Sequence, residues 1–337
     1  MALEYQRTKR PLLRGAKEVS IRVMTEDDIP ALRRFDDQVT AQLEVVNVQV
    51  PPGRESHPGG PWADDEWLTD HFRRYEERGN ITLLAEDEAG SIVAFADLWV
   101  AREPQPFGDS LDVECVDYFR EYYYLGIETV LLEEAEKVAR AAGLAALDIG
   151  TNTSSGDYPS LRRFGMKLFY EYDWVTCRCH PVPPDSPFTH RTISREDDPN
   201  WKDKVDWTGL LKVSHWSPTD FAFRDEPWVV ELGRDGRCAI VELWRVAERQ
   251  AGRTYALPVP ENPPTNSELY VEPDVLESSS MMSLVLRECA SLAGVVGAEE
   301  IRLPCPSEMA VDTSLVDALD REFAFAWMRK DLRPAAP

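Results

Sequence analysis

The sequence predicts an α/β (α+β) protein made of two similar mixed-sheet domains in tandem. Two observations support this prediction. First, residues 111–150 read as a strand, a glycine turn, a long amphipathic helix and a second strand, the pattern of a sheet covered by a helix. Second, the order of elements in the first half of the chain returns in the second half, which indicates an internal duplication.

The helix of the first half is the best-defined element. Residues at spacings of three and four predict its buried stripe: Ile127, Val130, Leu131, Ala135, Val138 and Ala142. The charged residues between 133 and 137 are expected mostly on the solvated side. Gly126 precedes the helix, and Gly143 follows it as a C-terminal cap. A turn that leads into a helix start directs backbone N–H groups and the positive end of the helix dipole at an anion.

Other elements of the first half follow from periodicity and turn residues. We expect a strand over Val19–Met24, a helix capped by Thr25, a Pro- and Gly-rich loop over 48–62, a helix over Glu66–Arg78, and a hairpin of Ile81–Ala85 with Ile92–Trp99. Leu111–Val116 and Leu144–Ile149 are the strands on either side of the long helix.

The second half repeats this order. Its expected elements are a hairpin of Trp228–Leu232 with Ala239–Trp244, a strand over Glu268–Glu272, a helix over Met281–Val296 that ends at Gly297, a strand over Glu299–Leu303, a helix over Asp312–Glu322 and a strand over Phe325–Met328. The domain boundaries that we expect are a loose leader at 1–18, a first domain at 19–180, a Pro- and Asp-rich linker at 181–208 and a second domain at 209–332.

Composition limits the function classes. The chain has 337 residues and a net charge of −23, which argues against broad binding to nucleic acid or anionic membranes and is compatible with a cationic small substrate. No stretch approaches the ~20 apolar residues of a membrane span, and the N-terminal residues lack the apolar core of a signal peptide. The six dispersed cysteines include no CxxC pair, so we expect reduced thiols, no metal site and a cytoplasmic protein.

One motif resembles a known family. The order of elements is a strand, Gly126-Ile127-x-Thr129, a helix, Gly143, a second strand and then Phe169–Trp174. In this order, this part of the chain resembles the core of GNAT-superfamily N-acetyltransferases. In that family the turn carries Arg/Gln-x-x-Gly-x-Gly/Ala, and its amides hold the pyrophosphate of acetyl-CoA. This chain keeps the glycine at 126 but has Tyr123 at the Arg/Gln position and Glu128 at the last glycine position.

The second half departs further from the family pattern, with Ser280 and Met282 at the glycine positions. The resemblance therefore favours a donor site in the first half. The two-copy arrangement is similar to that of mycothiol synthase and of some antibiotic-modifying acetyltransferases.

The resemblance implies direct attack of an amine on the thioester of acetyl-CoA or another acyl-CoA, without a metal. Candidates for the general base are Glu114 and Asp112, which share a strand face at period two, and Asp97 on the adjacent strand. Tyr170 or Tyr172 is a candidate to protonate the leaving thiolate. The residues expected to contact the donor are Val116, Arg120, Tyr124, Gly126, Ile127, Glu128, Thr129 and Asn152.

We therefore expect an N-acyltransferase that moves an acyl group, acetyl in the simplest case, to the amine of a small molecule. The net charge of −23 is compatible with a cationic acceptor. Two alternatives stay open. Glu128, Phe169, Ser280 and Met282 favour a GNAT-fold small-molecule-binding protein that has lost catalysis. The incomplete pyrophosphate loop favours a transferase that takes its acyl group from aminoacyl-tRNA, and the charge of −23 counts against it.

Overall fold

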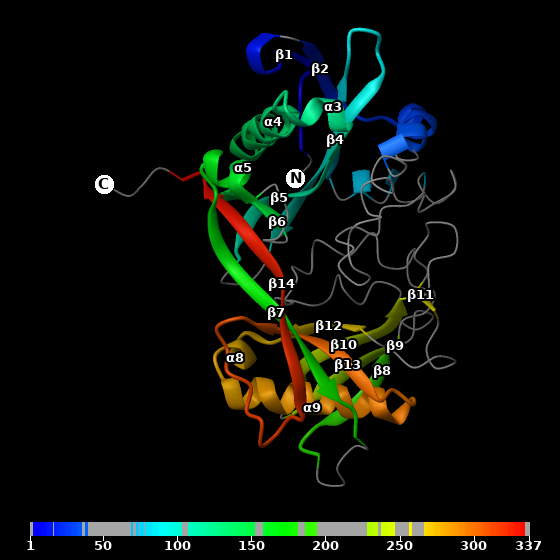
Figure 1. Cartoon of the computed structure of the whole chain (residues 1–337), viewed down its shortest axis with the longest axis vertical. Helices are drawn as coiled ribbons and strands as arrows, with labels where there is room; N and C mark the ends of the chain where they lie inside the picture. Colours follow the sequence, from blue (N-terminus) through cyan, green and yellow to red (C-terminus); the bar gives the residue numbers. More distant parts are fainter. Residues whose placement is uncertain are drawn as a thin grey trace.

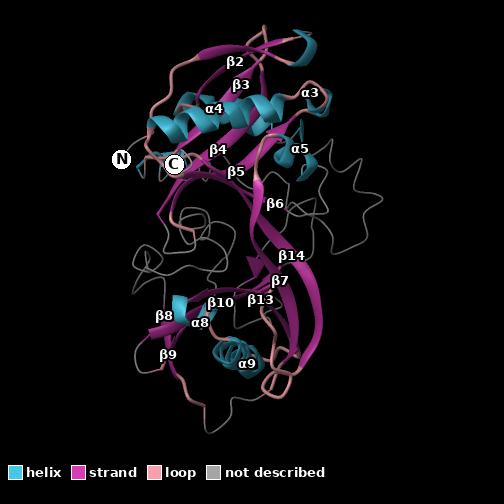
Figure 2. Ribbon diagram, turned by 90° about the vertical axis from the view of Figure 1, so that its left-hand side faces the viewer, coloured by secondary structure: helices cyan, strands magenta, loops and turns pink. Residues whose placement is uncertain are grey.

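The structure is a computed structural model, and the residues that it describes form one continuous sheet (Figures 1 and 2). Within these residues, thirteen strands follow one another across the sheet. The strand order is β1-β2-β3-β4-β5-β6-β14-β7-β13-β12-β10-β9-β8, and β11 pairs with β10 beside this path. The residues described are 3–15, 17–35, 38–39, 69, 72–73, 75–77, 79–102, 107–151, 158–180, 186–193, 228–234, 237–246, 256–257 and 266–333. The Pro- and Gly-rich loop expected at 48–62 lies outside them.

In the first half the elements are β1 (Thr8–Pro11), η1 (Leu13–Gly15), β2 (Glu18–Val23), η2 (Glu26–Asp28), β3 (Ile81–Glu86), β4 (Ile92–Arg102), β5 (Asp109–Tyr118), α3 (Arg120–Tyr123), α4 (Ile127–Ala141), β6 (Ala146–Thr151), α5 (Tyr158–Arg163) and β7 (Lys167–Arg178). In the second half they are β8 (Thr189–Ile193), β9 (Trp228–Gly233), β10 (Arg237–Val246), β11 (Ala256–Leu257), β12 (Asn266–Val271), α8 (Pro273–Leu276), α9 (Ser279–Val295), β13 (Glu300–Pro306) and β14 (Ala318–Asp331).

The duplication predicted from the sequence is confirmed by the element order of the two halves. Each half has an antiparallel hairpin, a parallel strand pair and a helix between the two parallel strands. Helix α4 covers one sheet face with the predicted apolar stripe, and α9 covers the second core cluster. The fold class predicted from the sequence is therefore correct.

The halves exchange their last strands. β14, from the end of the chain, pairs with β6 of the first half over Ala326–Asp331. β7 pairs with β13 of the second half over Tyr172–Arg178. The two long strands also pair with each other, so that they run side by side between the halves (Figure 1). The first half is thus completed by a strand from the second, and the second by a strand from the first.

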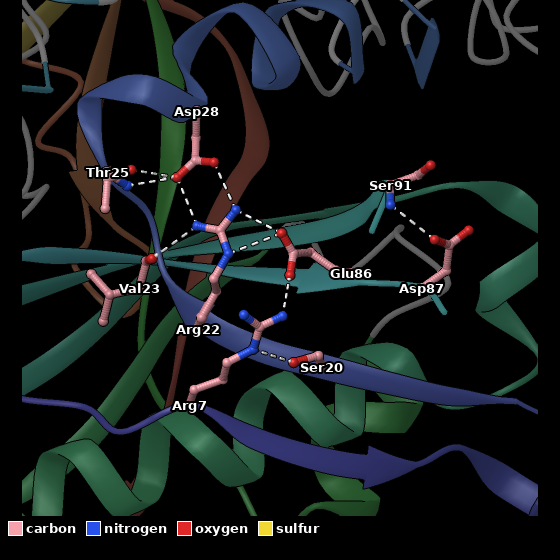
Figure 3. A network of polar contacts seen from close by, with 9 residues as sticks. All are labelled: Arg7, Ser20, Arg22, Val23, Thr25, Asp28, Glu86, Asp87 and Ser91. Carbon is pink, nitrogen blue, oxygen red and sulfur yellow. Dashed lines mark hydrogen bonds and ion pairs between the residues drawn. The ribbon is translucent and has the colours of Figure 1, made fainter. Parts of the chain in front are cut away.

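The expectation of a loose leader at 1–18 is wrong. Strand β1 pairs with β2, and Leu3 and Leu12 are buried in the first core cluster. Figure 3 shows how polar contacts fix this region: Arg7 donates to Glu86 and to Ser20, while Arg22 bridges Glu86 and Asp28. A short strand with alternating exposed residues has little apolar periodicity, which is why the sequence pattern missed it.

Helix α4 also differs from the prediction in one respect. Glu134 was expected on the solvated side, but its side chain is fully buried beneath the N-terminal segment. It accepts hydrogen bonds from Tyr5 Oη at 2.9 Å and Lys137 Nζ at 2.7 Å, and it pairs with Arg10. Burial raises the pKa of this carboxyl, but the contacts with Lys137, Tyr5 and Arg10 outweigh burial and lower it below its usual value.

The range 181–208, read from the sequence as a linker, contains strand β8, which pairs with β9. Its neighbour Phe188 is buried in the second core cluster. Ser186 Oγ and His190 Nε2 each lie 2.7 Å from Glu288 Oε1 on α9. Glu288 is fully buried, as is Glu134 on α4. Each half therefore anchors an edge strand to a buried glutamate of its central helix.

The prediction of a helix over Asp312–Glu322 is wrong. Asp312 accepts hydrogen bonds from the backbone N–H and the hydroxyl of Ser314, which stabilises a turn in place of a helix start. The chain is already in strand β14 at Ala318. Among the residues that the structure describes, no helix is long and apolar enough to span a membrane.

Candidate functional site

The parallel strands β5 and β6 pair over only part of their length. Their ladder runs from Ser110 opposite Ala146 to Val113 opposite Ile149. Beyond this point β5 continues to pair with β4, and β6 pairs with β14. We call the parting segments, Val113–Tyr118 of β5 and Ile149–Thr151 of β6, the β5–β6 fork. Past the rung of Val113 with Ile149, the described ladder between β5 and β6 has no further rung.

An irregularity in the β4–β5 ladder lies at the fork. Ala96 is opposite Val116, whereas Leu98 is opposite Val113. One residue of β4, Asp97, therefore faces two residues of β5, Glu114 and Cys115. Such a bulge bends the strand and redirects its side chains and amides. The Glu114 side chain lies outside the part of the chain that the structure describes.

Asp97 is the predicted base candidate at the bulge whose side chain the structure describes. Its neighbours Ala96 and Leu98 belong to the core under α4, so Asp97 points to the opposite sheet face. Thr82, its cross-strand partner on β3, donates a hydrogen bond to Asp97 Oδ1. Burial raises the pKa of Asp97 to about 6, with a further contribution from the negative charge of Asp117. Sequence reasoning missed both Thr82 and Asp117.

The start of α4 adjoins the strand that forms one arm of the fork. After β5, the short helix α3 leads to Gly126, which has a φ of 74° and forms the N-cap of α4. A Cβ atom at Gly126 would lie 2.9 Å from Leu13 Cδ1, so the left-handed backbone and the contact both favour glycine. Leu13 N donates to Leu125 O at 2.8 Å, which fixes the N-terminal segment against this turn. No sequence pattern predicts this contact.

The predicted donor-contact residues at the turn differ in exposure. Arg120, Tyr124 and Thr129 are exposed, with 81% of Tyr124 accessible, whereas Ile127 is fully buried. The amides of the first turn of α4 have no earlier helical carbonyl to bond, as at any helix start. Val116 is partly buried on β5. Asn152 lies outside the described residues.

Glu128 occupies the position at which a carboxylate would repel a phosphate. Ser160 Oγ on α5 donates to Glu128 Oε2 at 2.9 Å, and only 9% of the Glu128 residue is exposed. The carboxylate is thus turned toward α5 and engaged there. A carboxylate held in this way repels a phosphate at the helix start less than one that faces it.

Asp112, another predicted base, is fully buried. It accepts a hydrogen bond from Ser110 Oγ at 3.0 Å and lies in register with Asp148 on β6. Asp148, also fully buried, is held by Arg329 of β14 through two hydrogen bonds of 2.7 and 2.6 Å. This Asp112–Asp148–Arg329 row lies one residue before the fork, on the same sheet face as Asp97. Sequence reasoning missed Asp148 and Arg329.

The predicted proton donors lie on β7. Tyr170 packs against the core cluster of the second half, and its ring centroid lies 5.2 Å from that of Phe107. Burial raises the pKa of Tyr170 well above its usual value. Tyr172 is buried and stacks edge-to-face on Trp174. The structure thus brings Asp97 and the Glu114 backbone together, and places Tyr170 in a different cluster.

The corresponding region of the second half is built differently. Its parallel strands β12 and β13 share one rung, Asn266 opposite Arg302. At the start of α9, the Ser278 hydroxyl accepts a hydrogen bond from Met281 N at 3.2 Å, and Met282 is buried. Part of this helix start is therefore satisfied by its own N-cap. Within the described ranges of the whole chain, no three His, Cys, Asp or Glu side chains gather as metal ligands.

Comparison with known proteins identifies the fold. No protein-family model matches the sequence, and no curated protein matches it. Among solved structures, a GCN5-related N-acetyltransferase from Anabaena variabilis matches with a TM-score of 0.58 and 8% identity, over 94% of this chain and 73% of that one. A GCN5-related N-acetyltransferase from Kribbella flavida matches with a TM-score of 0.52 and 13% identity, over 94% and 71%.

A tandem GNAT protein from the clavulanic acid biosynthesis pathway matches with a TM-score of 0.52 and 10% identity, over 94% of this chain and all of that one, 100%. Identities this low show the fold alone. The chain has the GNAT fold in a tandem arrangement, as its sequence predicts.

Proposed function

We propose that the protein is an N-acyltransferase that moves an acyl group, acetyl in the simplest case, from acyl-CoA to the amine of a small molecule. The reaction would take place in the first half. The observation that supports this most strongly is the β5–β6 fork next to the glycine-capped start of α4. The fork offers backbone groups for an extended acyl-pantetheine chain, and the helix start offers amides and a positive dipole end for its phosphates.

The residues present fit an acyl-CoA donor. Gly126 keeps the turn free of a side chain, and Glu128 is engaged by Ser160 and so is not aimed at a phosphate. Arg120 and Thr129, both exposed beside the turn, would add a cation and a hydroxyl. Acyl-CoA supplies an activated thioester, and the inner edge of β5 from Glu114 to Tyr118 would contact its carbonyl.

Asp97 is the base in this proposal. With a pKa of about 6 it is mostly ionised at neutral pH, and it can accept a proton from an attacking ammonium directly or through one water. The neutral amine can then attack the thioester carbon, and the sulfur leaves as a thiolate that takes up a proton. Asp112 has a structural role here, because none of its side chain is exposed.

The acceptor would be a cationic small amine. Asp97 and Asp117 lie on the same sheet face near the bulge, and the chain has a net charge of −23. A negative field of this kind raises the local concentration of cations. The cytoplasm would supply both substrates, in keeping with the expected location of the protein.

Calorimetric titration of acetyl-CoA tests the donor site with a matched pair of variants. Gly126 and Gly143 have φ values of 74° and 69°, so Gly→Ala adds similar backbone strain at either end of α4. Only at Gly126 does the new Cβ meet another residue, Leu13 at 2.9 Å. We expect micromolar binding in the wild type and in Gly143→Ala, and binding weaker by about tenfold, which is about 1.4 kcal/mol, in Gly126→Ala.

Equal binding by both variants would place the donor elsewhere on the chain. Absence of binding by the wild type would refute an acetyl-CoA donor, and aminoacyl-tRNA would be the next donor to test. Where the wild type binds, release of free thiol with a panel of cationic amines identifies the acceptor class.

A further inference from the structure

We infer that the second half of the chain completes the site of the first, and that Arg329 on the exchanged strand β14 is a positioning residue for the β5–β6 fork. The inference rests on the proposed function, because binding of acyl-CoA at the fork is what Arg329 would influence. It goes further in giving the second half a defined part in that binding.

The Arg329 side chain joins three segments of the first half. Its Nε and Nη2 donate to the two carboxylate oxygens of Asp148 on β6, at 2.7 and 2.6 Å. Nη2 also donates to the carbonyl oxygen of Phe107, in the connection between β4 and β5, at 2.6 Å. The guanidinium stacks 3.7 Å from the ring centroid of Phe169 on β7. The guanidinium is planar, donates through several N–H groups and stacks on a ring, and lysine cannot reproduce this combination.

These contacts lie where β5 and β6 begin to part. Asp148 precedes Ile149, the last residue of β6 that pairs with β5. Its register partner Asp112 precedes Val113, the last paired residue of β5. Arg329 therefore fixes β6 one residue before the fork, from the side opposite β5. The direction in which β6 leaves β5, and hence the width of the fork, depends on this contact.

The first half has no strand of its own in this place. β7 follows β6 in the chain, yet β14 lies between them in the sheet. The ladder partners of β6 from Ala146 to Thr151 on this side all come from β14, Ala326–Asp331. The side chain of Asp148 is 0% exposed and that of Arg329 is 12% exposed, so water cannot replace the contact at low cost.

The second half provides a matched control. Arg302 on β13 has the rung position that Asp148 has on β6, and its neighbours in register are Asn266 and Thr176. The Arg302 side chain is 37% exposed and lies 3.4 Å from Glu322. Its substitution removes an arginine close to the same two exchanged strands, and the described contacts of Arg302 with β12, β7 and β14 do not reach β5 or β6.

The experiment compares Arg329→Met, Arg329→Lys and Arg302→Met by calorimetric binding of acetyl-CoA, together with hydrogen exchange of residues 111–118 without ligand. All measurements are made below the unfolding temperature of each variant. We expect Arg329→Met to weaken binding about 3- to 30-fold and to speed exchange at 111–118. Arg329→Lys should have a smaller effect in the same direction, and Arg302→Met should match the wild type.

Because Arg329→Met leaves Asp148 buried without its cation, it can fail to fold. The double variant Asp148→Leu with Arg329→Met removes both charges and keeps the volume, so it tests the same contact in a folded protein. Weak binding and fast exchange at 111–118 in the folded double variant support the inference.

Wild-type binding and exchange in either folded variant, Arg329→Met or the double variant, would overturn the inference. If the wild type itself does not bind acetyl-CoA, the proposed function fails. The exchange comparison still reports whether Arg329 orders the fork, so the two failures can be told apart.

Discussion

The two halves of the molecule put different chemistry on the same rung of their sheets. In the first half, Asp148 lies between Asp112 and Arg329, and its carboxylate is fully buried. In the second half, Arg302 lies between Asn266 and Thr176, and its side chain is 37% exposed. The two halves thus share this rung, but among the residues that the structure describes a buried ion pair occupies it only in the first half.

The starts of helices α4 and α9 also differ between the two halves. In the first half, a glycine with a φ of 74° is the N-cap of α4 and has no side chain that could accept from the amides of the first turn. In the second half, the Ser278 hydroxyl occupies one of these amides, and Met282 stands buried in the next turn. Features that suit an anionic donor therefore gather in the first half, and the second half supplies the strand that borders them.

The largest expected difference between the halves concerns the two arginines. Arg329→Ala removes the guanidinium that pairs with the buried Asp148 carboxylate and should lower the free energy of unfolding by about 3–5 kcal/mol. Arg302→Ala removes a partly exposed ion pair and should lower it by about 0–1 kcal/mol. Denaturant unfolding followed by circular dichroism measures both. Equal losses would mean that the two rungs do not differ in energy.

Asp97 and Glu242 offer the next comparison, since they precede Leu-Trp at corresponding places in the two sequences. Asp97→Asn should lower kcat about 10²- to 10⁴-fold, because the attacking amine loses its base. Glu242→Gln should leave kcat unchanged. In the wild type, kcat/KM should rise with pH through about 6 and then level off, since the ionised form of Asp97 is the active one. A flat profile, or a loss with Glu242→Gln, would contradict the assignment.

The buried glutamates of the two central helices differ in their partners. Glu134 is held by Arg10, Lys137 and Tyr5, so Glu134→Gln should cost about 1.5–3 kcal/mol. Glu288 accepts only from Ser186 and His190 among the described contacts, and Glu288→Gln should cost about 0.5–1.5 kcal/mol. Thermal and denaturant unfolding at pH 7 would measure the difference.

The pH dependence of Glu134 follows from its lowered pKa. A carboxyl whose pKa is depressed by folding stabilises the fold above its unfolded value, near 4.5, and loses this contribution as the pH falls further. The gap between the wild type and Glu134→Gln should therefore narrow on acidification below about pH 4.5. A gap that stays constant would show that the charge of Glu134 is not what stabilises the N-terminal strand.

The smallest effect expected is on stability at Asp97. Its pKa is raised in the folded state, so it binds its proton more tightly there than in the unfolded chain, and ionisation destabilises the fold as the pH rises through about 6. Asp97→Asn should therefore stabilise the protein slightly at pH 8 and less at pH 5. Greater stabilisation at the lower pH would reverse the sign and contradict the assigned cause.

The parts of the fold that the sequence predicted are those with strong local periodicity. The apolar stripe of α4, the glycines at its ends and the alternation in both hairpins depend on neighbouring residues, and all are present in the structure. The two edge strands β1 and β8 were missed because four or five mostly exposed residues give no periodic signal. Each is held in place partly by a residue far away in the sequence, β1 by Glu134 and β8 by Glu288.

The candidate site could be predicted only in part for the same reason. Gly126 and Asp97 stand in local motifs, so sequence reasoning found them. Asp148 and Arg329 are 181 residues apart in the chain, and their contact depends on the exchange of β7 and β14. A strand exchange leaves no local pattern, because the exchanged strands keep the same alternation that they would have within their own halves.

Hydrogen exchange of the whole chain with and without acetyl-CoA would test most directly the claim that the donor binds in the first half. We predict that the ligand protects amides in 111–118 and 126–132 and leaves those in 266–271 and 278–284 unchanged. Protection at the start of α9, or no protection at either helix start, would contradict the account.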